Sequence, residues 1–140
     1  MPVVTYDPTQ VIVTVNGSTI SGFVDGTFVA VEHAAETFSK VVGAYGEVAR
    51  VKSADRSGTM TLTLMQSSNS NLVLNALANL DEQTSTGIVP VLVKDLSTRG
   101  EVFAAEGWIK GKPKVEWGKE MSNREWIFEL ASVAITPGGV

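Results

Sequence analysis

The sequence predicts a mainly β fold, an antiparallel β-sandwich or small barrel with one packed α-helix. Short segments rich in β-branched residues fill most of the 140 residues, and turn pairs such as Asn16-Gly17 and Asp25-Gly26 separate them. One segment near the middle of the chain has helical periodicity instead. Strands precede and follow this helix without the βαβ alternation of a parallel sheet, so we expect a single domain over residues 1–140.

Four strands are predicted before the helix, over Gln10–Val15, Gly26–Ala34, Val48–Lys52 and Thr59–Gln66. The last has the clearest pattern, because threonines alternate with large apolar residues along it. The threonines are Thr59, Thr61 and Thr63, and the apolar residues are Met60, Leu62 and Leu64. We expect the apolar side chains to face the core and the threonines to face solvent or a lumen.

One amphipathic helix is predicted over residues 69–82. The polar run Ser67–Ser70 offers several side chains that can cap its N-terminus. Helical spacing predicts a buried stripe that consists of Val73, Ala76, Leu77 and Leu80. A separate polar face consists of Asn71, Asn75 and Asn79.

Three further strands are predicted after the helix, over Gly87–Lys94, Glu101–Lys110 and Arg124–Thr136. A polar and basic linker, Gly111–Asn123, separates the last two. Pro90 has no backbone N–H to donate to a neighbouring strand, so we expect it at a sheet edge or at a bulge.

Composition excludes several kinds of site. The chain has no cysteine, which excludes disulfides, thiolate metal sites and cysteine catalysis. His33 is the only histidine, so we expect an ordinary strand residue and no zinc site. No apolar stretch approaches the roughly 18 residues that a membrane-spanning helix needs. We therefore expect no catalytic group, no cofactor, no metal and no membrane association.

Two motifs have possible nucleic-acid interpretations, and in both the simpler structural one is favoured. Gly43–Gly46 is a GxxG sequence, which a KH domain uses to clamp a nucleic-acid backbone, but we expect a flexible turn. Lys110, Lys112 and Lys114 alternate ahead of an aromatic residue, as on single-strand-binding surfaces, but a solvated loop or a lysine-protected edge strand fits as well. The net charge of −4, with no Lys or Arg before Lys40, also disfavours DNA binding.

An ordered series of short motifs runs along nearly the whole chain. Its members are Asp25–Thr27, Gly46–Arg50, Asp55–Thr59, Thr61–Leu64, Ser68, Asn71, the helical residues Leu74, Ala76 and Leu77, Gly118–Glu120, and Asn123–Trp126. This series resembles the tail tube proteins of contractile-tailed bacteriophages, the Mu-like phages and their relatives. The resemblance extends from about Gly22 to Gly139.

The resemblance implies a structural protein of the virion, assembled in the cytoplasm of the host bacterium. Such subunits share a fold with the tube protein of type VI secretion systems and form hexameric rings that stack into a hollow tube. A contractile tail sheath protein surrounds the tube, a tape-measure protein fills it, and baseplate and terminator proteins lie at its ends. Double-stranded DNA passes through the lumen without specific binding.

Three surfaces follow as expectations. An extended loop over Thr37–Gly58, partly disordered in the free subunit, is expected to contact a neighbouring subunit or ring through Lys40, Glu47, Arg50, Lys52, Asp55 and Arg56. The residues expected to face the lumen are Glu32, Glu36, Thr59, Thr61 and Thr63. The residues expected on the outer wall, towards the sheath, are Lys110, Lys112, Lys114 and Lys119.

Three alternatives remain open at this stage. A type VI secretion tube or a bacteriocin tube would share the fold and the assembly but carry different cargo. A tail terminator or neck protein would cap a tube without polymerising. A small enzyme or ligand-binding β-barrel is the least favoured alternative, because no convergent set of polar residues is visible.

Overall fold

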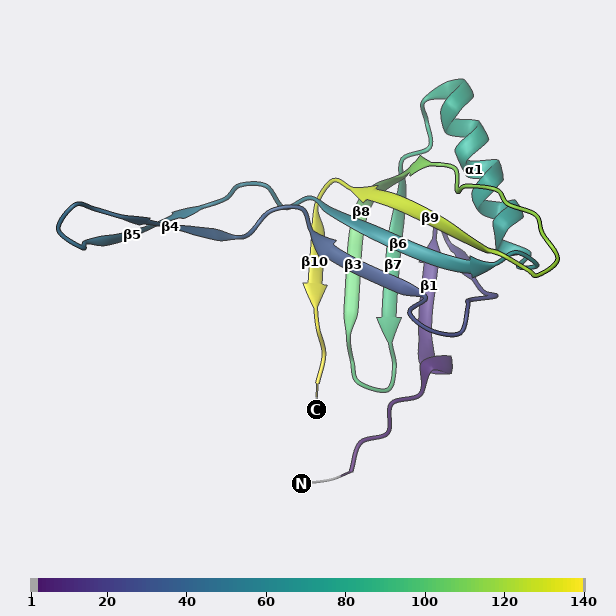
Figure 1. The fold of residues 1–140 in the computed structure, drawn as a ribbon, viewed down its shortest axis with the longest axis horizontal. Helices are drawn as coiled ribbons and strands as arrows, with labels where there is room; N and C mark the ends of the chain where they lie inside the picture. Colours follow the sequence, from purple (N-terminus) through teal and green to yellow (C-terminus); the bar gives the residue numbers. More distant parts are fainter. Residues whose placement is uncertain (1–2, 140) are drawn as a thin grey trace.

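The computed structural model describes residues 3–139, which form an antiparallel sheet of eight strands, one helix and a separate two-stranded hairpin (Figure 1). The predicted mainly β class with one packed helix is confirmed. In chain order the elements are η1 (Pro8–Gln10), β1 (Val11–Val15), β2 (Ser18–Ile20), β3 (Val29–His33), β4 (Phe38–Val42), β5 (Val48–Lys52), β6 (Gly58–Met65), α1 (Ser70–Thr84), β7 (Val89–Asp95), β8 (Glu101–Gly111), β9 (Asn123–Leu130) and β10 (Val133–Thr136).

The large sheet folds into two layers around the long strand β8. Its strand order is β2-β1-β7-β8-β9-β6-β3, and β10 also pairs with β8. The first part of β8 pairs with β7 and β10, and its last part pairs with β9. In Figure 1, β3, β6 and β9 run obliquely across β1, β7, β8 and β10. The two layers are therefore the β3–β6–β9 layer and the β1–β7–β10 layer, joined through β8.

The core lies between these layers and follows the alternation of the strands. Met60, Leu62 and Leu64 of β6 are fully buried, whereas the threonines between them are half-buried on the opposite face. Phe128 contributes from β9, and Val13 from β1, to the same apolar cluster. The predicted core face of β6 is confirmed, as period-two burial in a half-covered sheet requires.

The Asn16-Gly17 pair forms the turn of a hairpin between β1 and β2. Both residues have positive φ angles, 50° and 79°, as a type I′ turn needs. Val15 and Ser18 pair directly across the turn. Strand β2 was not predicted, because its three residues are too few to show an alternating pattern.

Strand boundaries differ from the prediction at two places. Pro90 occupies an interior strand between β1 and β8, and the pairing register shifts between Val89 and Val91, so the predicted bulge is confirmed and the edge position is not. The strand predicted over Arg124–Thr136 is in fact two strands. The chain leaves β9 at Leu130 and crosses to pair with β8 as β10, and the Ala131 N–H donates to the Glu106 carbonyl at the crossing (2.9 Å).

Helix α1 is present as predicted, but it buries a different stripe. The buried residues are Ser70, Leu74 and Ala78. Of the predicted stripe, Leu77 is half-buried, whereas Val73 and Leu80 are 44% and 46% exposed. Because both stripes are apolar, periodicity alone does not choose between them.

Polar contacts at the start of the helix determine how it is rotated. The Ser70 hydroxyl accepts a hydrogen bond from the Ser21 N–H (2.9 Å), and the Asn71 amide oxygen accepts one from the Trp126 indole (3.0 Å). Gly22 permits this close approach, since a Cβ atom there would lie 2.4 Å from the Ser68 hydroxyl. These contacts turn Leu74 inward and leave Val73 outside.

The segment predicted as a loop over Thr37–Gly58 is a β-hairpin that projects from the body on the side away from α1 (Figure 1). Strand β5 matches the predicted strand, and β4 was missed because no alternation of apolar and polar residues marks it. The Gly43–Gly46 sequence forms the turn, with Gly46 at a φ angle of 88°. All ten residues of β4 and β5 are exposed.

Candidate assembly surfaces

A polar face covers the outer side of the β3–β6–β9 layer. Antiparallel pairing places Glu32, Thr59 and Glu129 in one cross-strand row. The polar face consists of Ala30, Glu32, Thr59, Thr61, Thr63, Trp108, Lys110, Glu125, Ile127 and Glu129. It therefore carries three carboxylates and one ammonium group.

Its electrostatic character is negative. The only ion pair on the described part of this face joins Lys110 Nζ to Glu129 Oε1 at 3.6 Å, with the lysine largely exposed. Such solvent-exposed pairs contribute little to stability. Glu32 and Glu125 have no cation within salt-bridge distance among residues 3–139.

The predicted lumen-facing residues are largely brought together here. Glu32 and the three threonines Thr59, Thr61 and Thr63 share the polar face. Glu36 does not, since it lies beyond the end of β3 in the segment that leads to the hairpin.

The four lysines expected on one outer wall are divided between two places. Lys110 lies on the polar face with Glu32, because it follows Trp108, the strand partner of Glu129, by two residues and forms an ion pair with Glu129. Glu32 and Lys110 therefore lie on the same face of the subunit, whereas the sequence placed them on opposite walls. Lys112, Lys114 and Lys119 lie instead in the segment between β8 and β9.

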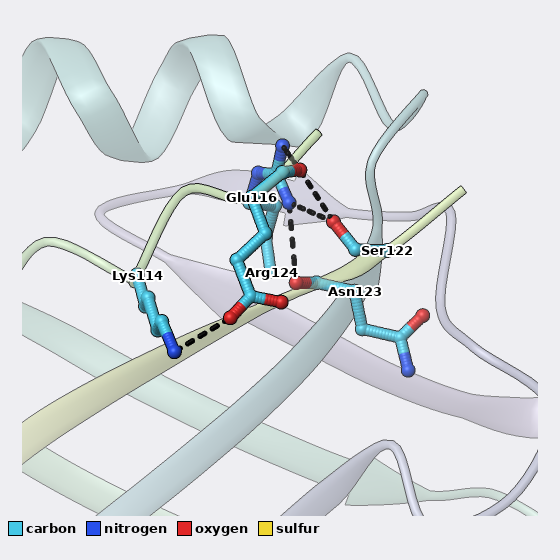
Figure 2. A network of polar contacts seen from close by, with 5 residues as sticks. All are labelled: Lys114, Glu116, Ser122, Asn123 and Arg124. Atoms are coloured by element: carbon cyan, nitrogen blue, oxygen red, sulfur yellow. Dashed lines mark hydrogen bonds and ion pairs between the residues drawn. The ribbon is translucent and has the colours of Figure 1, made fainter. Parts of the chain in front are cut away.

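That segment is fixed to the body by the buried side chain of Arg124, which is 7% exposed (Figure 2). Its guanidinium donates to the Ser122 hydroxyl (2.6 Å) and to the carbonyls of Asn123 (3.3 Å) and Glu116 (3.4 Å). The Ser122 hydroxyl in turn donates to the Glu116 carbonyl (2.8 Å). A buried cation needs such acceptors, so Arg124 holds the segment against the start of β9.

An exposed ion pair lies on the solvent side of this network. Lys114 Nζ lies 2.6 Å from Glu116 Oε1 (Figure 2). The hydrogen bond and the charge of Lys114 lower the pKa of Glu116, and the same contact raises the pKa of Lys114. Nearby, the Lys112 ammonium donates to the Asn79 amide oxygen on α1 (2.5 Å).

The residues expected to make ring contacts have two different roles in the hairpin. Lys40, Arg50 and Lys52 project from its strands, and Arg50 lies 4.2 Å from the centre of the Phe38 ring. Glu47, Asp55 and Arg56 instead support the hairpin itself.

Local hydrogen bonds show how they do so. The Glu47 carboxylate accepts from the Tyr45 N–H in the turn (3.2 Å), and Arg56 donates to the Thr37 hydroxyl across the base (3.1 Å). The Asp55 carboxylate accepts from the hydroxyl (2.6 Å) and the N–H (3.0 Å) of Ser57. These two bonds, the hydroxyl's first, lower the pKa of Asp55.

Several grooves border α1, and two of them differ clearly in charge. The linker groove, about 400 Å³, is lined by Gln66, Asn71, Leu72, Asn75, Lys112, Pro113, Val115, Trp117, Arg124 and Trp126. The helix groove, about 230 Å³, is lined by Val15, Asn16, Ser18, Val73, Ala76, Leu77 and Leu80. The first contains two cationic residues and the second contains no charged residue.

Neither groove has the features of a catalytic or metal centre. Within residues 3–139, no group of three or more His, Cys, Asp or Glu side chains is placed to hold a metal ion. The described chain also contains no helix long and apolar enough to cross a membrane.

Sequence reasoning missed two sets of surface residues. Glu125 and Glu129 of the polar face alternate with buried Trp126 and Phe128, so the strand pattern of β9 contained the signal for them. The exposed apolar residues of α1 carried no such signal, because their exposure depends on how the helix is rotated against the sheet.

Comparison with known proteins gives consistent results. The family model described as Bacteriophage PhiTE tail tube protein matches residues 4–138. The structural protein ORF10 of Pseudomonas phage KPP10 is 32% identical over 143 residues, which cover 96% of this chain and 83% of that protein.

Solved structures share the fold at low sequence identity. The tube-terminating cap of the anti-feeding prophage matches with a TM-score of 0.65 and 9% identity, over 99% of this chain and 95% of that one. The sheath/tube terminator of the extracellular contractile injection system PVC matches with a TM-score of 0.63 and 12% identity, over 97% of each chain. A chain of the sheath-tube complex of PVC matches with a TM-score of 0.60 and 11% identity, over 95% and 92%.

The match to the family model spans nearly the whole described chain, and the relative from phage KPP10 is itself a structural protein. The chain therefore belongs to the PhiTE tail tube protein family and is a structural component of the phage tail, not an enzyme.

Proposed function

We propose that this protein is the subunit of a phage tail tube, that it forms stacked hexameric rings, and that the lumen of the tube conducts the genome during infection. The family match carries this proposal, and the polar face supports it. A lumen wide enough for duplex DNA needs a closed barrel larger than the roughly 16–18-stranded porins. One chain supplies too few strands, so several copies must share the wall.

The β3–β6–β9 layer is suited to form that wall. Within the described part of the chain strand β3 pairs only with β6, so one of its edges is open to a neighbouring copy. Ring closure removes such edges, which otherwise promote uncontrolled association. The polar face would then line the channel, with the apolar core of each subunit behind it.

The charge of the polar face fits a channel for DNA. Glu32, Glu125 and Glu129 outnumber Lys110, and every subunit of a ring would repeat this set at the same radius. Accumulated negative potential repels phosphate, so duplex DNA would slide without specific binding.

The expected partners follow from the same assembly. The matched proteins of the PVC system come from a sheath-tube complex and a sheath/tube terminator. We expect this protein to be enclosed by a contractile sheath in the virion, around a tape-measure protein and between baseplate and terminator proteins, after assembly in the host cytoplasm. Lys112, Lys114 and Lys119 are then candidates for sheath contacts.

A terminator that caps the tube is the second candidate function. It is favoured by the match to the anti-feeding prophage cap, whose TM-score exceeds that of the PVC sheath-tube chain by only 0.05. A tube of a contractile injection system or bacteriocin, which carries no phage genome, has the same architecture. The presence of capsid genes beside the gene for this protein would favour the phage tube.

Electron microscopy of the purified protein separates the first two candidates. A tube subunit stacks head to tail and forms tubes whose length rises with concentration, because its contacts are heterologous and open. A terminator forms single rings that do not stack. Monomers at high concentration, without rings, would contradict both.

A further inference from the structure

The β4–β5 hairpin is an arm that pairs with no other strand among residues 3–139. All ten strand residues are exposed, and Tyr45 at the turn is 93% exposed. An isolated two-stranded hairpin is at best marginally stable in water. Its exposed apolar side chains include Val41, Val48 and Val51, so the arm is suited to pack against another surface.

The pairing register divides the hairpin into two unlike faces. Phe38 pairs with Lys52 and Lys40 pairs with Arg50, so all three basic residues of the strands lie on one cationic face. The opposite, uncharged face consists of Ser39, Val41, Ala49 and Val51. Only the uncharged face can be buried without removing an ammonium or guanidinium group from water.

The linker groove and the helix groove differ in how they would receive this arm. The linker groove contains Lys112 and the buried Arg124, which would oppose a cationic hairpin. Like charges brought together across an interface are strongly unfavourable. The linker groove is therefore a poor match for the arm.

The helix groove is a good match in both polarity and charge. Its apolar wall is formed by Val73, Ala76, Leu77 and Leu80. No Lys or Arg occurs anywhere from Ser57 to Val93, and the only charged residues in that stretch are Asp81 and Glu82 at the end of α1. Asp81 and Glu82 line a separate groove of mixed charge, together with Lys110 and Lys112. The helix groove itself contains no charged residue, so it suits the uncharged face of the hairpin and opposes none of its three cations.

We propose that the hairpin of one copy packs its uncharged face into the helix groove of a second copy. This inference rests on the proposed self-assembly and assigns the contact that links the subunits. The hairpin and α1 lie at opposite sides of the molecule (Figure 1), so the contact is heterologous and repeats from copy to copy. It would bury Val73 and Leu80, which the fold of a single chain leaves exposed.

Engineered cysteines test the contact directly, because the natural chain has none. In a Val41→Cys/Ala76→Cys double variant, oxidation should join successive copies and give a ladder of multimers on a non-reducing gel. A disulfide requires Cα atoms within about 7 Å, so only the proposed packing allows it.

Two matched controls fix the face and the groove. Val42→Cys/Ala76→Cys places the thiol on the opposite face of the hairpin, and Val41→Cys/Trp117→Cys places the second thiol in the linker groove. We expect at least about tenfold less cross-linking in both controls, given the same distance requirement. All substituted hairpin positions are exposed, so the fold is retained.

Microscopy of the same variants under reducing conditions separates the two proposals. Tubes with a ladder only in Val41→Cys/Ala76→Cys support both. Tubes in which that pair stays unlinked, or in which a control links equally well, overturn the docking site and leave the tube function intact. A ladder without rings or tubes supports the contact and contradicts the tube function, and the absence of both overturns both.

Discussion

At the scale of single residues, β6 separates two roles by strict alternation. Leu62 is fully buried between its strand partners Val29 and Trp126, whereas Thr61 next to it lies half-buried on the polar face. The same strand thus supplies both the core and the proposed wall of the channel. Substitutions at adjacent positions should therefore have very different effects.

The first prediction concerns this pair. Leu62→Ala leaves a cavity in the core and should lower the free energy of unfolding by about 2–5 kcal/mol. Thr61→Ala, the matched control, should change it by less than about 0.5 kcal/mol, as surface substitutions usually do. Urea denaturation of the subunit measures both, and equal effects would contradict the assignment of the two faces.

The second prediction concerns Asp55 at the base of the hairpin. The hydrogen bonds from Ser57 lower the pKa of Asp55, so the folded state favours the carboxylate. Any stability from these bonds is present above the ordinary pKa of an aspartate and is lost as the pH falls through the lowered pKa.

Ser57→Ala removes the hydroxyl and should move the pKa of Asp55 back towards its ordinary value. A titration followed by NMR at the Asp55 carboxyl carbon measures the change. Asp7, whose pKa is lowered by Thr9 at a distant site, is the internal control and should not respond. An unchanged pKa of Asp55 in the variant would rule out the hydroxyl as the cause.

At the scale of elements, α1 shows how polar contacts decide between two apolar stripes. Ser70 and Asn71 are held by Ser21 and Trp126, and this rotation buries Leu74 while Val73 remains 44% exposed. The exposed stripe then becomes available to another copy. Helix rotation is therefore the link between the fold and the proposed contact.

The third prediction tests that rotation with two leucines of one helix. Leu74→Ala should destabilise the isolated subunit by about 2–5 kcal/mol, because its side chain is fully buried. Leu72→Ala should cost less than about 0.5 kcal/mol. Thermal unfolding of both variants checks this, and a larger loss for Leu72→Ala would contradict the observed rotation of the helix.

Local patterns predicted the elements whose structure depends on few neighbours. The alternation in β6 and the Asn16-Gly17 turn are examples, since a period of two and a pair of positive φ angles are both local properties. Three features depended on distant contacts and were not predictable in this way. These are the rotation of α1, the crossing from β9 to β10, and the position of Lys110 beside Glu129.

Only one strand of the hairpin was predicted, because the other has no local pattern of its own. Strand β5 has a recognisable apolar and basic pattern, whereas Phe38–Val42 becomes a strand through its pairing with β5. Its role in contacts with other copies came from the resemblance to tail tube proteins, because no property of a single chain specifies what lies opposite an exposed surface.

At the scale of the whole molecule, charge is divided between the arm and the body. The two hairpin strands carry three basic residues and no acidic one, although the chain has a net charge of −4. The body is therefore more acidic than the chain as a whole. This division favours contacts between unlike surfaces of successive copies over contacts between like ones.

The fourth prediction concerns the proposed channel. Glu32→Lys reverses one charge of the polar face in every subunit without disturbing the core, so the protein should still assemble. Because the substitution attracts phosphate, we expect slower genome delivery and salt-dependent retention of duplex DNA by the tubes. Asp25→Lys, an exposed charge reversal of the same sign outside the polar face, is the control and should leave delivery unchanged. If the Glu32→Lys variant delivers the genome at the normal rate, the assignment of Glu32 to the channel is wrong.

A cryo-electron microscopy reconstruction of the assembled protein is the most direct test of the tube proposal. It should show stacked hexameric rings in which Glu32, Thr61 and Glu125 line the lumen and the core strands lie behind them. A tube with this polar face on its outer wall, or a particle in which the rings never stack, would contradict it.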